Sequence, residues 1–299
     1  MSNIVLYHTG NKSLNPLSGE YYDPWSNHIW LCIEQIRKWN PTIPIFMITD
    51  DIEVTQKQNF EKYAVIREFV GKLTTTYDID SLPYYNNDNN PMSRSSGIRT
   101  FYIEEVMKKN NLSDVFTFDN DVLVYCDLEK IGTILSSLIE RTAITPVSYQ
   151  EMVFGMCYIK NTESLSIINK RIWKMINEKK NLSDMVMWHD IWKDSGISLV
   201  DILPIWIFEE FSALLTNIGG IFDPASIGQY LLGCHNGNPA GSLFPHHYIH
   251  NRLREGSYTF LKQKDDHDRI YISLYDNNTK KEYKILSIHV HNKKLKELM

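Results

Sequence analysis

Residues 115–125 read Val-Phe-Thr-Phe-Asp-Asn-Asp-Val-Leu-Val-Tyr, an apolar run interrupted by two carboxylates. Its β-branched and aromatic residues predict a buried strand. Residues i and i+2 of a strand point to the same side, so Asp119 and Asp121 can reach one cation as the strand ends. Two unpaired carboxylates beside buried residues are costly unless a positive charge neutralises them. A divalent ion such as Mg²⁺ or Mn²⁺ suits them, because it takes oxygen ligands and bridges phosphates.

The chain before this run alternates between strand and helix patterns. An apolar stripe predicts a helix at 28–39, and buried strands are predicted at 4–7, 44–51 and 64–70. A β-α-β order of this kind is typical of a parallel sheet with helices packed on its faces. Ligands of such sheets bind at the carboxyl ends of the strands, which is where the acidic pair falls. This context favours a cation site over the alternative, a solvated turn.

The rest of the chain mixes both element types. Residues 74–93 are polar and rich in turn formers, which predicts a long loop. Helices are predicted at 98–109, 164–178 and 181–193. Strands are predicted at 143–146, 153–159, 258–261, 269–275 and 282–291, with a hairpin turn at 276–279. The sequence has no internal repeat and no low-complexity tract.

Basic and imidazole side chains accompany the acidic pair. The helix before the central run begins with Arg94 and Arg99, which are well placed for an anionic ligand. The last strand carries His289 and His291 on one face, and two lysines follow it. Neutral imidazole would complete a Mn²⁺ shell, and lysine suits a diphosphate as a point charge.

This combination resembles the GT-A-fold glycosyltransferases. The resemblance rests on three features: the β-α-β half, the Asp-x-Asp strand preceded by an arginine, and the His-containing last strand followed by lysine. Residues 99–128, 222–231 and 288–293 are similar to recurring motifs of bacterial and large-virus sugar transferases of the capsule type. The resemblance implies an α/β fold with a Rossmann-type central mixed sheet flanked by helices and a C-terminal β-hairpin region. One domain would span 1–299, with a nucleotide-sugar-binding half at 1–130 and an acceptor half with the metal-binding strand at 131–299.

The function implied by the resemblance is a metal-dependent glycosyltransferase of the hexosyltransferase class. It would move a sugar from a nucleotide-diphosphate sugar, with a UDP-sugar favoured, to a glycan, a lipid-linked glycan or another hydroxyl acceptor in polysaccharide biosynthesis. Mn²⁺ or Mg²⁺ would be held by Asp119, Asp121, His289 and His291. The donor would contact His8, Thr9, Gly10, Asp50, Asp51, Arg99, Asn120, Lys293 and Lys294. Retaining and inverting chemistry both stay open.

Catalytic candidates lie in the second half of the chain: Asp184, Asp223 and Gln229. Asp184 resembles the acidic residue that many GT-A enzymes set beside the reaction centre, and it equally suits the first turn of a helix, where a carboxylate favours the dipole. A helix N-cap and a turn explain Asp50 and Asp51 as well as ligand contacts do.

Three other readings remain. Paired aspartates also serve metal-dependent nucleotidyltransferases and nucleotide-sugar phosphohydrolases, although the further grouped ligands of a two-metal hydrolase are not found in the sequence. A second alternative is a sugar- or nucleotide-binding protein without enzymatic activity.

A third alternative is a zinc site. His246, His247 and His250, near Cys234 and His235, suggest zinc, but the run lacks a matching second cluster, so lining or supporting the acceptor cleft is favoured.

Composition sets outer limits. The 299 residues include 31 basic and 36 acidic side chains, a formal net charge of −5, which argues against a nucleic-acid partner. Aromatic residues make up 12% of the chain and are common where sugars or bases bind. The four cysteines are widely spaced, and no signal peptide or apolar window of membrane-spanning length is found. We therefore expect a cytoplasmic protein without an integral membrane segment, and its oligomeric state is left open.

Overall fold

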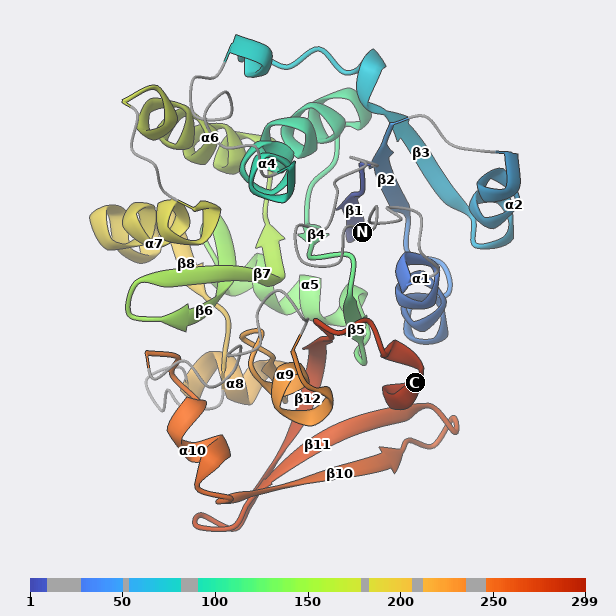
Figure 1. Ribbon diagram of the computed structural model, residues 1–299, viewed down its shortest axis with the longest axis vertical. Helices are drawn as coiled ribbons and strands as arrows, with labels where there is room; N and C mark the ends of the chain where they lie inside the picture. Colours follow the sequence, from blue (N-terminus) through green and yellow to red (C-terminus); the bar gives the residue numbers. More distant parts are fainter. Residues whose placement is uncertain (10–27, 51–53, 82–90, 179–182, 206–211, 235–245) are drawn as a thin grey trace, which may run out of the picture.

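The apolar runs near the start of the chain form the parallel half of a seven-stranded sheet (Figure 1). The computed structural model describes residues 1–9, 28–50, 54–81, 91–178, 183–205, 212–234 and 246–299. Strand order in this sheet is β3-β2-β1-β4-β7-β6-β8. The parallel strands are β1 (Asn3–Tyr7), β2 (Ile45–Thr49), β3 (Val65–Phe69) and β4 (Val115–Thr117). The predicted parallel arrangement is confirmed.

The other half of the sheet makes it mixed. It consists of β6 (Thr142–Ser148), β7 (Glu151–Ile159) and β8 (Val200–Ile202). Strand β7 runs antiparallel to both β4 and β6, and β8 runs parallel to β6. The central mixed sheet flanked by helices is thus confirmed.

Side chains alternate between the two faces of the sheet and divide the core into two layers. Ile4 and Leu6 belong to one apolar cluster and Val5 to the other. The first layer is covered by α1 (His28–Trp39), α2 (Val54–Lys62), α5 (Leu128–Leu138) and α8 (Ser212–Ile218). The second layer is covered by α4 (Pro91–Asn110), α6 (Thr162–Asn177) and α7 (Asp184–Ser195). Among the described helices, none combines the length and apolar character needed to cross a bilayer.

A second sheet lies at the C-terminal end of the chain (Figure 1). Its antiparallel order is β10-β11-β12-β5, and β9 pairs with β12 in parallel. The strands are β5 (Val122–Val124), β9 (Ile221–Phe222), β10 (Tyr258–Lys264), β11 (Ile270–Asp276) and β12 (Lys281–His289). Short helices α9 (Ile227–Leu232) and α10 (His250–Arg254) and the short 3₁₀ turns Val70–Lys72, Ile79–Ser81, Gly196–Ser198 and Leu295–Leu298 complete the described elements. The predicted hairpin region is therefore part of a larger sheet.

The prediction of one strand over 115–125 is wrong. The run divides into β4 and β5, which belong to different sheets, and the Asp-Asn-Asp tripeptide forms the connection. The Asp119 N–H donates to the Phe154 carbonyl at 2.8 Å, and the Val122 N–H donates back to the Asp119 carbonyl at 3.2 Å. These bonds turn the chain out of the first sheet, so that β5 pairs with β12. The helix predicted to begin near residue 98 begins at Pro91, a residue favoured in the first turn.

Helix α9 packs tightly against the end of β12. A Cβ atom on Gly228 would lie 2.1 Å from the His289 carbonyl oxygen and 2.8 Å from its carbonyl carbon. Neither atom can rotate away, because both belong to the backbone. Gly228 therefore fixes how closely α9 approaches His289.

We expect Gly228→Ala to lower the free energy of unfolding by about 1–3 kcal/mol, because the added methyl group overpacks this contact. In an ordinary helix interior the same change stabilises by about 1 kcal/mol. Urea unfolding measures the difference, with Tyr230→Phe on the same helix as control. A Gly228→Ala protein as stable as the parent would contradict the packing described.

Candidate active site

The Asp-Asn-Asp connection lies at the carboxyl end of β1 as well as β4. These strands are adjacent and parallel, so their carboxyl ends lie side by side. The Asn120 side-chain amide donates to the Tyr7 carbonyl at 2.9 Å and lies 2.7 Å from His8 Nδ1. The structure therefore brings Asn120 and His8 together, as the prediction of a shared donor site requires.

Strand β12 brings the C-terminal imidazoles to the same connection. His289 pairs with Val122 across the sheet, and the Val290 N–H donates to the Asp121 carbonyl at 2.9 Å. His289 Nε2 lies 3.0 Å from an Asp121 carboxylate oxygen and 3.7 Å from one of Asp119. The His291 ring stacks on the His289 ring, with centroids 4.2 Å apart. The predicted clustering of both aspartates with both histidines is thus present.

Two further cations enclose the carboxylates. Lys293 forms an ion pair with Asp121. Arg99 forms ion pairs with Asp119 and, at 2.6 Å, with Asp184 at the first turn of α7. Six side chains therefore alternate in charge, and we call them the charge chain: Asp184, Arg99, Asp119, His289, Asp121 and Lys293.

Strand β7 supports the middle of the charge chain. The Arg99 guanidinium lies 3.9 Å from the centre of the Phe154 ring. Phe154 also holds the Asp119 N–H with its carbonyl, and its ring packs edge-on against buried Trp188 of α7. Arg99 and Asp119 are therefore placed by the same buried residue.

Burial and neighbouring charges shift the pKa values of Asp121 and His289 in opposite directions. Burial raises the pKa of Asp121, but His289 and Lys293 outweigh it, so the pKa lies well below its usual range. Burial lowers the pKa of His289, yet the Asp121 and Asp119 carboxylates keep it above the ordinary 6.5. The two groups therefore favour each other's charged form.

The ligand types at this junction are those that a divalent cation takes, but the ligand atoms of Asp119, Asp121 and His289 do not all lie within 4.8 Å of one another, so the two carboxylates would have to close around an ion. Asp119 and Asp121 supply carboxylate oxygens and His289 supplies an imidazole nitrogen directed at both, a combination suited to Mn²⁺. His289 Nε2 faces both carboxylates, and it would have to be without a proton to bind a metal ion.

His28 belongs to the same surroundings and was not predicted. It begins α1, and its ring lies edge-on to His8 with centroids 6.1 Å apart. Burial, followed by the positive charge of Lys293, lowers the pKa of His28 to about 3. One turn later, the Cys32 thiol donates to the Asn120 carbonyl at 3.0 Å. The i, i+4 spacing of His28 and Cys32 was the available signal, although nothing local ties it to residue 120.

The remaining predicted donor contacts are only partly placed. The Thr9 hydroxyl lies 3.4 Å from that of Ser95 on α4. Asp50 follows β2, and its carbonyl accepts from Arg67 at 3.1 Å. Lys294 is exposed, and no described contact joins its side chain to the charge chain. Gly10 and Asp51 lie outside the described residues.

Asp223 has a different place from the one predicted. Its fully buried carboxylate accepts four backbone N–H groups at 2.8–3.0 Å, from Ser226, Ile227, Gly228 and His289. Burial raises the pKa of Asp223 although these donors oppose the shift. The carboxylate thus joins α9 to the residue that carries the imidazole, and we assign it a positioning role. Gln229 is buried on α9, with its carbonyl oxygen 3.7 Å from the Cys234 sulfur.

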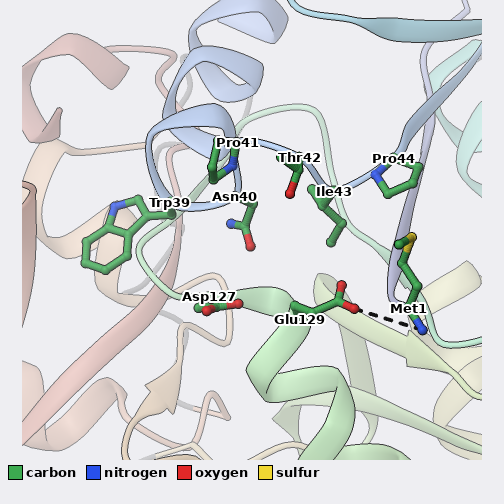
Figure 2. Close-up of a pocket in the computed structure, with 9 residues that line it drawn as sticks. All are labelled: Met1, Trp39, Asn40, Pro41, Thr42, Ile43, Pro44, Asp127 and Glu129. Carbon is green, nitrogen blue, oxygen red and sulfur yellow. Dashed lines mark ion pairs between the residues drawn. The ribbon is translucent and has the colours of Figure 1, made fainter.

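A pocket of about 330 Å³ opens elsewhere (Figure 2). It is lined by Met1, Glu129 and the 39–44 segment, at the amino ends of β1 and β2. Some of its polar groups bond within the protein. The N-terminal ammonium lies 3.9 Å from Glu129, and Asn40 bonds the Leu128 N–H. This pocket therefore lies at the amino ends of the parallel strands, whereas the charge chain lies at their carboxyl ends.

No family model matches the sequence, and no curated protein is significantly similar to it. Solved structures with distant likeness include mouse xyloside xylosyltransferase 1, at 10% identity over 73% of this chain and 94% of that one, with a TM-score of 0.46. The glycosyltransferase GlyE of Streptococcus pneumoniae TIGR4 has 12% identity over 85% and 59%, with a TM-score of 0.43. The CTP:phosphocholine cytidylyltransferase of S. pneumoniae has 14% identity over 68% and 90%, with a TM-score of 0.35. At these scores the likeness carries no functional argument.

Replacing Arg99 should destabilise the fold. We expect Arg99→Gln to lower the free energy of unfolding by about 3–5 kcal/mol, because two largely buried carboxylates lose their shared partner. The control is Arg141→Gln, which breaks a more exposed pair with Glu163 and should cost less than about 1 kcal/mol. Equal losses in the two variants, measured by urea unfolding, would refute the assigned difference.

The raised pKa of His289 predicts a pH dependence of stability in chelator-treated protein. A raised folded-state pKa contributes stability that is complete below about pH 6.5 and is lost as pH rises through the folded value. Above about pH 6.5 the free energy of unfolding should therefore fall with rising pH, by at most about 1.4 kcal/mol per pH unit from this group. His289→Gln should flatten that slope, whereas His267→Gln, at an exposed position, should keep it.

Proposed function

We propose that the protein is a metal-dependent glycosyltransferase that moves a sugar from a nucleoside-diphosphate sugar to a hydroxyl acceptor. The observation that supports this most is the charge chain at the carboxyl ends of β1 and β4. It combines two carboxylates and an imidazole for a cation with lysine and arginine for phosphate oxygens. Metal-dependent nucleotidyl transfer and phosphohydrolysis use the same two sets of groups, so the reaction products must separate these classes.

Bound Mn²⁺ or Mg²⁺ would supply positive charge to the diphosphate and so stabilise it as a leaving group. Asp119, Asp121 and His289 would hold the ion, with His291 stacked behind His289. Lys293 has a side chain one-third exposed, so its ammonium can turn from Asp121 toward a phosphate oxygen. The same lysine thereby neutralises the site before the donor binds and the diphosphate afterwards.

The opposite end of the charge chain would face the acceptor. Arg99 holds Asp184 beside Asp119, and the Asp184 carboxylate keeps some exposure. We assign Asp184 to binding the acceptor hydroxyl, with Arg99 fixing its direction. His8, Thr9 and Asp50, at the ends of β1 and β2, would contact the ribose and base of the donor. A UDP-sugar donor and a glycan or lipid-linked glycan acceptor complete the proposal.

Calorimetric titration of UDP-, GDP- and CMP-sugars, with and without Mn²⁺, tests the function. We expect at least one donor to bind more tightly with Mn²⁺, and Asp121→Asn to weaken that binding by at least about tenfold. Asp268→Asn, at a highly exposed carboxylate, is the matched control and should bind as the parent does. If no nucleotide sugar binds in either condition, the proposal is wrong.

Product analysis separates the reaction classes. Transfer releases a nucleoside diphosphate only when an acceptor is present. A phosphohydrolase would consume the donor at the same rate without an acceptor, and a nucleotidyltransferase would release pyrophosphate from a nucleoside triphosphate. Either of the last two results would replace the proposed reaction while leaving the metal site in place.

A further inference from the structure

A second group of metal-ligating side chains lies outside the charge chain. Glu151 begins β7, and His246 and His247 precede α10, which Figure 1 shows below the β6–β7 hairpin. One ligand atom from each of the three residues lies within 4.8 Å of the others. Within the described parts of the chain, no other group of histidine, cysteine and acidic residues meets this condition.

The distances suit a small tetrahedral ion. Zinc bonds of about 2.0–2.2 Å place neighbouring ligand atoms about 3.3 Å apart. His246 Nε2 lies 3.2 Å from a Glu151 carboxylate oxygen, which is already that separation. The His246 and His247 rings are perpendicular, with centroids 4.8 Å apart. Since the His246 side chain is half exposed, it can rotate to close the remaining distance to the His247 ligand atom.

Backbone pairing holds the two segments together independently of any ion. Ser148 and His247 form an antiparallel bridge, and the Tyr248 N–H donates to the Val147 carbonyl at 3.0 Å. The Ser148 hydroxyl lies 3.5 Å from the Glu151 carboxylate oxygen and also accepts the Gln150 N–H. The hydroxyl thus lies at the limit of hydrogen-bonding distance from the same carboxylate oxygen that faces His246.

We propose that Glu151, His246 and His247 bind a divalent ion of the zinc class, with water at a fourth position. Two imidazoles and one carboxylate favour zinc over Mg²⁺ or Mn²⁺, which prefer oxygen-rich sites. The ion would cross-link the tip of the β6–β7 hairpin to the segment that leads into α10. This site is independent of the proposed sugar transfer, because it shares no residue with the charge chain.

Titration of the full chain with Zn²⁺ alone, in competition with a chromophoric chelator, tests this site. The background protein, called the parent, carries Asp119→Asn and Asp121→Asn, so that it lacks two ligands of the proposed donor site. We expect this parent to bind one ion, and His246→Ala or Glu151→Gln added to it to weaken binding by at least about 10- to 100-fold. The control is His267→Ala, at an exposed histidine, which should bind as its parent does.

Two further readouts keep the result unambiguous. Co²⁺ in the same site should give the intense visible absorption of tetrahedral coordination, lost in His246→Ala. In the otherwise unaltered chain, the same single substitutions should abolish the rise in Tm that Zn²⁺ produces. This measurement still tests the site if the parent with both aspartates changed fails to fold. If His246→Ala and Glu151→Gln bind Zn²⁺ as tightly as their parents, the site does not exist.

Discussion

The buried carboxylate of Asp121 lies at the connection between the two sheets. Its side chain is only 6% exposed, and an isolated buried charge would cost several kcal/mol. Both of its ionic partners, His289 and Lys293, come from the end of the chain, up to 172 positions away. Strand β12 lies against β5, and this pairing brings both cations to the carboxylate. The carboxylate thus adds an electrostatic constraint to the backbone pairing and the apolar cluster that hold the second sheet.

Several close contacts make that placement specific. The Asp223 carboxylate accepts the His289 N–H, and Gly228 allows α9 to approach the His289 carbonyl. Gly155 of β7 allows an equally close approach on the other side, since a Cβ there would lie 2.6 Å from the Asp223 carbonyl oxygen. The backbone around the imidazole is thus held from two directions. The Lys293 side chain is one-third exposed and has room to reorient, which suits a group that must change partners when a ligand binds.

Sequence patterns predicted what depends on local order. The helix at 28–39 has the predicted limits, and the hairpin turn after Asp276 was foreseen because turn residues act within a few positions. The split at 119–121 was missed because the run is apolar on both sides, and only pairing with β12 shows that it changes sheets. His28 and Glu151 were missed because their partners lie far away in the sequence. Glu151 meets His246 across 95 positions, and no spacing rule covers that distance.

The two proposed metal sites differ in a way that follows from charge. The charge chain has three acidic and three basic groups, so a divalent ion entering it meets Arg99 and Lys293 as well as the carboxylates. An anionic diphosphate offsets those cations, and the ion and the donor should therefore favour each other's binding. Around Glu151 the ligands are mainly imidazoles, which bind a transition ion without needing an anion. One site is accordingly suited to an ion that arrives with substrate, and the other to an ion that stays with the fold.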